Sequence, residues 1–138
     1  MEYISNNEKQ TFQIAKNLAK KFKGGEILLL KGDLGAGKTA FTKGIAQALG
    51  IKSIITSPTF TIMNEYTSNN LELYHFDMYR IEDVNELKEL GFEQYIGNSK
   101  GIACIEWFEK TPELFLNKKT ILIEFEKLND TKRKIRIN

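Results

Sequence analysis

A short glycine-rich segment between positions 32 and 39 has the residue types and the spacing to hold phosphate groups. It reads GDLGAGKT and matches the pattern G-x-x-x-x-G-K-[ST] at every fixed position. Glycines let consecutive backbone N–H groups converge on anionic oxygens, and a lysine adds a positive charge. Contacts to the phosphates of ATP are therefore expected from Gly32, Gly35, Ala36, Gly37, Lys38, Thr39 and Ala40.

Residues at and beyond this loop could hold a magnesium ion. Free amides at the start of the following helix favour phosphate, and the Thr39 hydroxyl is placed to bind Mg²⁺. Phosphoryl transfer also needs an acid at the carboxyl end of a neighbouring buried strand. Glu106 ends the apolar run GIACIE, and Asp77 ends the weaker run LYHF. Either acid could instead be an ordinary surface carboxylate.

Other residues near these acids have weaker signals. His75 alternates with aromatic residues and is expected to be a packed or hydrogen-bonded histidine rather than a base, because nothing near it completes a triad or a metal set. Trp107 could be a core aromatic or a platform for a partner, and Arg80 could contact a phosphate or pair with an acid.

The apolar pattern on both sides of the glycine-rich segment predicts a strand, a loop and a helix. The run EILLLK, residues 26–31, is typical of a strand buried on both faces. After Lys38, apolar residues share a helical face, and Gly50 stands where a left-handed cap is expected. A first helix is predicted over about 8–22, opened by a capping box of Ser5 with Glu8 and ended by glycines at 24 and 25.

The remaining segments predict a mixed sheet. Residues 59–66 and 71–79 form a predicted hairpin around TSNN, and one or two short helices follow within 84–95. A second buried strand is expected over 101–107, and residues 120–128 and 132–138 predict an antiparallel pair around NDT. The chain is thus predicted to be α/β: a P-loop NTPase three-layer fold, with a central parallel sheet and antiparallel additions, in a single domain over 1–138.

Composition narrows the classes of function. A net charge of +2 is too small to diagnose nucleic-acid binding, and the basic clusters at 16–23 and 127–136 are solvated faces or a surface for phosphate or an acidic partner. The single cysteine, Cys104, excludes a disulfide framework within the chain. With no apolar leader and no run long enough to span a bilayer, we expect a cytoplasmic protein without membrane contact.

Two classes of phosphate-loop protein fit less well. Ras-type GTPases require N-K-x-D, and the segment NKKT at 117–120 lacks the carboxylate that reads guanine. Small-molecule kinases generally add a lid and an acceptor pocket, for which this chain has little room. A kinase therefore stays an alternative, as does a protein that binds ATP only as a conformational signal.

Further motifs follow the phosphate loop in a fixed order: SPTFT at 57–61, YHFDMYR at 74–80, ELGFEQY at 89–95 and IEW at 105–107. In this order, over about residues 8 to 110, the chain resembles the TsaE family of bacterial ATPases. The resemblance implies a role in making threonylcarbamoyladenosine in tRNAs that read codons beginning with A. It implies weak, partner-dependent ATP hydrolysis that supports turnover of a complex of TsaB and TsaD, with tRNA reached indirectly through that complex.

The resemblance also implies roles for single residues. Lys38 would be the phosphate lysine, Thr39 and Glu106 the magnesium-associated pair, and Asp77 a further active-site acid. Positions near the nucleotide would also include Thr11, Thr59 in a switch-like loop, and Trp107, with Arg133 a candidate for contacts to adenine. Phe108 departs from the family pattern, which puts the geometry just past Trp107 in doubt.

Overall fold

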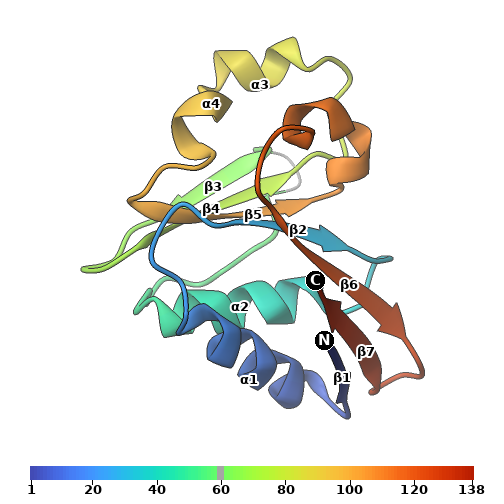
Figure 1. Ribbon diagram of the computed structural model, residues 1–138. Helices are drawn as coiled ribbons and strands as arrows, with labels where there is room; N and C mark the ends of the chain where they lie inside the picture. The colour runs from blue at the N-terminus through green and yellow to red at the C-terminus, as the bar shows by residue number, and fades with distance from the viewer. Residues whose placement is uncertain (59–60) are drawn as a thin grey trace.

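A twisted sheet forms the centre of the computed structural model, which describes residues 1–58 and 61–138. In this part of the chain the sheet has 7 strands in the order β1-β7-β6-β2-β5-β4-β3 (Figure 1). Its middle is parallel: β2 (Ile27–Lys31) lies between β5 (Gly101–Glu106) and β6 (Ile121–Lys127), and β4 (Glu72–Asp77) lies beyond β5. The carboxyl ends of these four strands therefore meet along one edge of the sheet.

Antiparallel strands complete both sides. On one side, β3 (Met63–Tyr66) pairs with β4, which confirms the predicted hairpin. On the other side, β7 (Arg133–Ile137) pairs with β6, and this confirms the predicted closing pair. The outermost strand, β1 (Glu2–Ser5), pairs with β7 and was not predicted, because its partner lies at the opposite end of the sequence.

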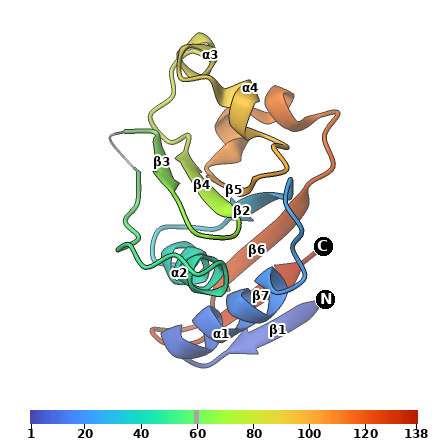
Figure 2. The same cartoon turned by 90° about the vertical axis from the view of Figure 1, so that its left-hand side faces the viewer.

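Helices cover both faces of the sheet (Figures 1 and 2). One face carries α1 (Glu8–Ala19) and α2 (Lys38–Ala48). The other face carries four short helical segments: α3 (Asn85–Glu89), α4 (Phe92–Tyr95), η1 (Phe108–Lys110) and η2 (Pro112–Phe115). The predicted three-layer P-loop NTPase fold with a parallel centre is confirmed.

The start of α1 differs from the prediction. Ser5 does not cap the helix: it is the last residue of β1, and its hydroxyl lies 2.7 Å from that of Thr11. The cap is Asn7, whose side chain accepts a hydrogen bond from the backbone N–H of Gln10 at 2.9 Å. The capping-box prediction was wrong because pairing with β7 holds Ser5 in an extended strand. The helix also ends at Ala19, earlier than residue 22.

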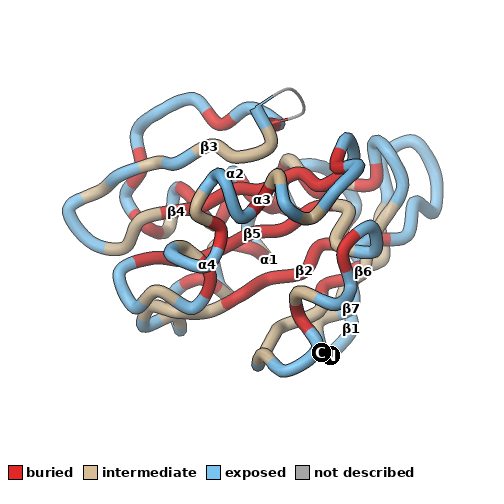
Figure 3. Tube along the Cα trace, turned by 90° about the horizontal axis from the view of Figure 1, so that it is seen from above, coloured by how far each residue is buried: buried red, intermediate tan, exposed pale blue. Residues whose placement is uncertain are grey.

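Buried side chains fill the space on each side of the sheet. Phe41 and Ile45 of α2 pack with Leu28 and Leu30 of β2 on one face, whereas Leu29 packs in the cluster on the other face. Figure 3 shows the buried chain concentrated in the central strands. β2 is thus buried from both faces, as its continuous apolar run predicts, and it gives the loop that follows a rigid base.

The surface charge and the length of the helices bear on what the protein can contact. Part of the basic cluster near the C-terminus is neutralised, since Lys134 and Arg136 pair with Glu2 at 3.3 and 3.4 Å. Across residues 1–58 and 61–138, no helix has both the length and the apolar character needed to cross a bilayer.

Candidate nucleotide-binding site

The loop between β2 and α2 has the backbone that a phosphate cradle requires. Gly35 and Gly37 have φ values of 76° and 111°, in the left-handed region that side chains disfavour. Gly37 immediately precedes the first residue of α2, so the free amides of the helix N-terminus open into the loop. At Gly32, a Cβ atom would lie 3.0 Å from Phe125, which leaves little room for a side chain.

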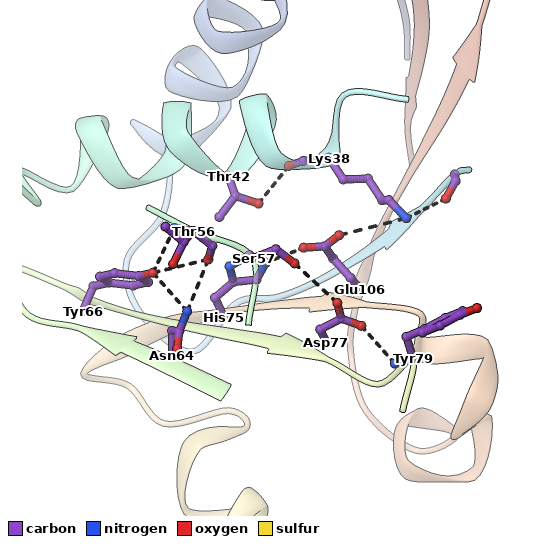
Figure 4. Close-up of polar contacts among 11 residues, drawn as sticks. Lys38, Thr42, Thr56, Ser57, Asn64, Tyr66, His75, Asp77, Tyr79 and Glu106 are labelled. Atoms are coloured by element: carbon purple, nitrogen blue, oxygen red, sulfur yellow. Dashed lines mark hydrogen bonds and ion pairs between the residues drawn. The ribbon is translucent and has the colours of Figure 1, made fainter. Parts of the chain in front are cut away.

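Lys38, the first residue of α2, reaches back to the start of this loop. Its side chain is buried, and Nζ donates a hydrogen bond to the Gly32 carbonyl at 2.6 Å. The same ammonium group lies 4.0 Å from Glu106 Oε1 (Figure 4) and 4.5 Å from the centroid of the Trp107 ring. A positive charge is therefore fixed between the loop and the end of β5.

The two predicted acids lie side by side. Asp77 and Glu106 are opposite each other in the register of the parallel strands β4 and β5, and each is the last residue of its strand. Both are only 5% exposed and both line the same cavity. They are therefore partly withdrawn from water, which strengthens their interactions with charges in the cavity.

Asp77 has a perturbed acidity. Burial raises its pKa, the Tyr79 backbone N–H that donates to Oδ1 at 2.9 Å lowers it, and the neighbouring Glu106 raises it further. His75 and Lys38 lower the pKa by smaller amounts, so the net shift is upward from 3.8. The Ser57 hydroxyl approaches Oδ2 at 3.5 Å. Asp77 thus holds a proton more readily than an exposed aspartate does.

His75 contacts the second acid directly. It is fully buried, and its Nε2 lies 2.5 Å from Glu106 Oε2 (Figure 4). The expectation of a hydrogen-bonded histidine is confirmed. Its partner, however, comes from a strand 31 residues further along the chain, a contact that no local pattern could indicate.

Two aromatic rings border the acids on the solvent side. The centroids of the Tyr79 and Trp107 rings are 5.0 Å apart, and both residues line the cavity. Trp107 has φ of 56°, which is unusual for a bulky residue, and it follows Glu106 directly. Ile62 has φ of 69°, and its carbonyl accepts a hydrogen bond from the Asp77 N–H at 2.8 Å. Backbone strain is therefore found next to both acids.

Two further predicted residues lie beside Gly37 of the phosphate loop, where a Cβ atom would be 3.7 Å from the Thr11 side chain and 3.9 Å from that of Arg133. Thr11 is buried and, like Arg133, lines the cavity; Arg133 Nη2 donates to the Gly35 carbonyl at 2.9 Å. The cavity has a volume of about 700 Å³, within the usual range for a ligand of nucleotide size. Thr59 lies outside the described residues.

The oxygen donors that line the cavity suit a Mg²⁺ ion bound together with phosphate better than a metal ion held by protein side chains alone. Thr39 contributes a hydroxyl and Glu106 a carboxylate to the lining of the cavity, and Asp77 lies beside Glu106 in the strand register. Among residues 1–58 and 61–138, no group of three or more His, Cys, Asp or Glu side chains could hold a metal ion. Magnesium usually takes one or two carboxylates and completes its shell with phosphate oxygens and water, so this sparse set is suitable.

Comparison with known proteins decides the family. The family model described as "Threonylcarbamoyl adenosine biosynthesis protein TsaE" matches residues 5–135. The chain belongs to the TsaE family. The TsaE match extends past residue 110, where the motifs in the sequence end, and includes most of β7 with Arg133.

Individual TsaE proteins and a solved structure agree with this assignment. The chain is 44% identical to TsaE of Bacillus subtilis (strain 168) over 129 residues, covering 94% of this chain and 79% of that protein. It is 39% identical to TsaE of Aquifex aeolicus (strain VF5) over 138 residues, covering 99% and 94%. The crystal structure of YdiB from Bacillus subtilis superimposes with a TM-score of 0.79 at 36% identity, covering 98% of this chain and 82% of that one.

Several residues of this TsaE site have no signal in the sequence. Tyr79 lies within the YHFDMYR motif, but its tilted ring contact with Trp107 joins the segments that follow β4 and β5 and could not be predicted from spacing. Ser5, which contacts Thr11, was read as a helix cap. Asp130 and Thr131 line the cavity from the turn between β6 and β7, which only the sheet order brings beside the phosphate loop.

Proposed function

We propose that this protein binds ATP with Mg²⁺ at the loop Gly32–Thr39 and hydrolyses it to support repeated turnover of a TsaB–TsaD complex. That complex would carry out threonylcarbamoyladenosine modification of tRNA. The observation that carries the proposal is the convergence of Lys38, Asp77 and Glu106 at the phosphate loop. The names of the relatives, which refer to tRNA threonylcarbamoyladenosine biosynthesis, support the choice of pathway.

Each residue of the site has a proposed task. Backbone amides from Gly35 to Ala40 hold the β- and γ-phosphates, and the Lys38 ammonium exchanges its contact with the Gly32 carbonyl for phosphate oxygens. Thr39 and Glu106 hold Mg²⁺, which when bound neutralises charge on the phosphates. Asp77 orients the attacking water.

The base and ribose are assigned to the part of the cavity that Thr11 and Arg133 line. Trp107, whose ring contacts the Lys38 ammonium, is assigned a place near the phosphates. Thr59 is assigned to a loop that responds to the terminal phosphate, because the neighbouring Ile62 is hydrogen-bonded through its carbonyl to the backbone of Asp77. Loss of the phosphate could then be communicated to a partner.

The protein is proposed to act in the cytoplasm as a single domain over residues 1–138. Its contact with tRNA is indirect, through TsaB and TsaD. The charge distribution is consistent with this, because Lys134 and Arg136 are already paired with Glu2.

A reconstituted modification reaction tests the role in the pathway. Purified TsaB, TsaD, tRNA and the activated intermediate are combined with and without this protein, and modified tRNA is counted per TsaD. We expect multiple turnovers only when the protein and ATP are both present. Equal yields with and without the protein would refute the proposal.

Glu106→Gln separates hydrolysis from signalling by nucleotide binding. If hydrolysis is needed, this variant binds ATP but neither hydrolyses it nor supports multiple turnovers. Full modification by a variant without hydrolysis would favour the alternative in which ATP acts only as a conformational signal. A labelled γ-phosphate recovered on a metabolite, rather than as free phosphate, would instead indicate a kinase.

A further inference from the structure

The carboxylate of Glu106 is held by different groups at its two oxygens. Oε2 lies 2.5 Å from His75 Nε2, and Oε1 lies 4.0 Å from Lys38 Nζ (Figure 4). Asp77 is opposite Glu106 in the register, and His75 is two residues before Asp77 on β4. Because side chains alternate along a strand, the three side chains project from the same face of the sheet.

We propose that His75 is a positioning residue, which holds Glu106 Oε2 so that Oε1 is directed at the cation bound with the nucleotide. The inference rests on the proposed function, since it assigns Glu106 to that cation. His75 itself would touch neither nucleotide nor metal: it is fully buried and is absent from the lining of the cavity.

The surroundings of the imidazole ring define which nitrogen carries hydrogen. Among the described residues Nδ1 is buried without a hydrogen-bond partner, so a hydrogen on Nδ1 would be a buried, unsatisfied donor. Placing the hydrogen on Nε2 gives Glu106 its donor and leaves Nδ1 as a bare lone pair. The hydrogen that faces Glu106 is therefore placed on Nε2.

A single directed hydrogen bond is enough to orient the carboxylate. Glu106 ends a fully buried strand, and its backbone carbonyl accepts a hydrogen bond from the Met78 N–H at 3.0 Å, so the backbone there is already fixed. The Glu106 side chain could still rotate about its own bonds, and the contact with His75 prevents this rotation. Partners of this kind typically change metal affinity or activity about 10- to 100-fold when mutated.

Two amide variants make a matched pair. The side-chain N–H of glutamine can take the place of Nε2–H, whereas the shorter asparagine places its amide near Nδ1 and cannot reach Glu106. Both put an uncharged amide in the same buried position. His75→Gln should therefore keep the orientation of Glu106, and His75→Asn should lose it.

The readout is the factor by which Mg²⁺ tightens binding of a non-hydrolysable ATP analogue, measured by calorimetry with Mg²⁺ and with a chelator. For His75→Asn we expect this factor to fall by about tenfold or more, while affinity in the chelator stays within about twofold of wild type. His75→Gln should keep most of the factor. Thermal melts without nucleotide establish that each variant is folded.

A double-mutant cycle shows whether His75 acts through Glu106. In a Glu106→Gln background the cation loses its carboxylate, so adding His75→Asn should change the Mg²⁺ factor by less than about twofold. An effect of undiminished size in that background would overturn the inference, as would a wild-type factor in His75→Asn alone.

The remaining outcomes also decide. Equal loss of affinity with Mg²⁺ and with chelator in His75→Asn would mean a structural role only. If that variant does not fold, His75→Gln decides: a retained Mg²⁺ factor supports the inference, and a lost factor in a folded protein overturns it. A wild-type protein that binds no Mg²⁺–nucleotide would refute the proposed function itself, which is a separate result.

Discussion

The ionisable side chains Lys38, Asp77 and Glu106 each expose no more than 6% of their surface. Removing charges from water is costly unless other groups compensate. Here the Gly32 carbonyl compensates Lys38, His75 compensates Glu106, and the Tyr79 N–H compensates Asp77. Bound phosphate and a metal ion would complete this set of charges. Because a cluster of buried charges stabilises a fold poorly, its presence here is typical of a binding site for charged ligands.

Lys38→Ala should weaken nucleotide binding. The variant loses a charge-assisted contact worth about 1.5–3 kcal/mol, so we expect the dissociation constant for ATP to rise roughly 10- to 100-fold. Calorimetry measures this directly. Lys43→Ala removes an exposed lysine of the same helix and should bind as the wild type does. Unchanged affinity in Lys38→Ala would count against the whole assignment of the loop.

Asp77 should make the stability of the protein depend on pH. Burial raises its pKa above 3.8 in the folded chain, so between the unfolded and folded pKa values the folded state carries the additional proton. The free energy of unfolding contributed by this group therefore falls as the pH rises through that interval.

Asp77→Asn removes this dependence while keeping an oxygen for the Tyr79 N–H. The free energy of unfolding of the variant minus that of wild type should increase as the pH rises above the unfolded pKa of an aspartate, about 4, and level off once the raised folded pKa is passed. Urea titrations across this range measure it. Glu89→Gln, at an exposed position of α3, is the control and should follow the wild type. A difference that is constant with pH would contradict the raised pKa.

Local sequence patterns predicted helices and strands correctly wherever neighbours in sequence determine the structure. β2, the phosphate loop and α2 were predicted because apolar runs and glycines act locally. The predicted start of α1 was wrong because the conformation of Ser5 is determined by its pairing with Arg133, on a strand that begins 128 residues further along the chain. The contact of His75 with Glu106 was equally hidden, since it depends on the register of two parallel strands.

Gly44→Ala should destabilise the packing of α1 against α2. A Cβ atom at this position would lie 2.4 Å from the Phe12 carbonyl oxygen and 2.7 Å from Ala15 Cβ. Overpacking costs about 1–3 kcal/mol, more than the gain of up to about 1 kcal/mol from replacing glycine by alanine in a helix. The net loss of unfolding free energy should be about 1 kcal/mol, and at most about 2 kcal/mol, by urea titration.

Gln47→Ala serves as the control for this prediction. Gln47 is exposed on the same helix, so the unfolding free energy of this variant should stay within about 0.5 kcal/mol of that of wild type. A Gly44→Ala protein that is more stable than wild type would mean that α1 can move away from α2 at little cost.

The sheet order brings segments near the two ends of the chain to the site. β1 and β7 are neighbours at one side of the sheet, and the turn that precedes β7 reaches the cavity through Asp130 and Thr131. Figure 1 shows the termini close together beside β7. The C-terminal hairpin therefore contributes to the lining of the cavity, although it carries no recognisable motif.

Arg133→Ala should expose this contribution. The guanidinium group donates to the carbonyls of Gly35 at 2.9 Å and Asn129 at 2.7 Å, and so joins the hairpin to the phosphate loop across 98 positions of sequence. Its loss should free the loop and cost about 1 kcal/mol of binding free energy, or roughly a fivefold rise in the dissociation constant for ATP by calorimetry.

Arg136→Ala is the matched control, because Arg136 lies on the same strand but pairs with Glu2. If both variants bound ATP as the wild type does, the hairpin would be a structural border of the cavity only; if both lost affinity equally, general positive charge rather than the contact with Gly35 would be responsible.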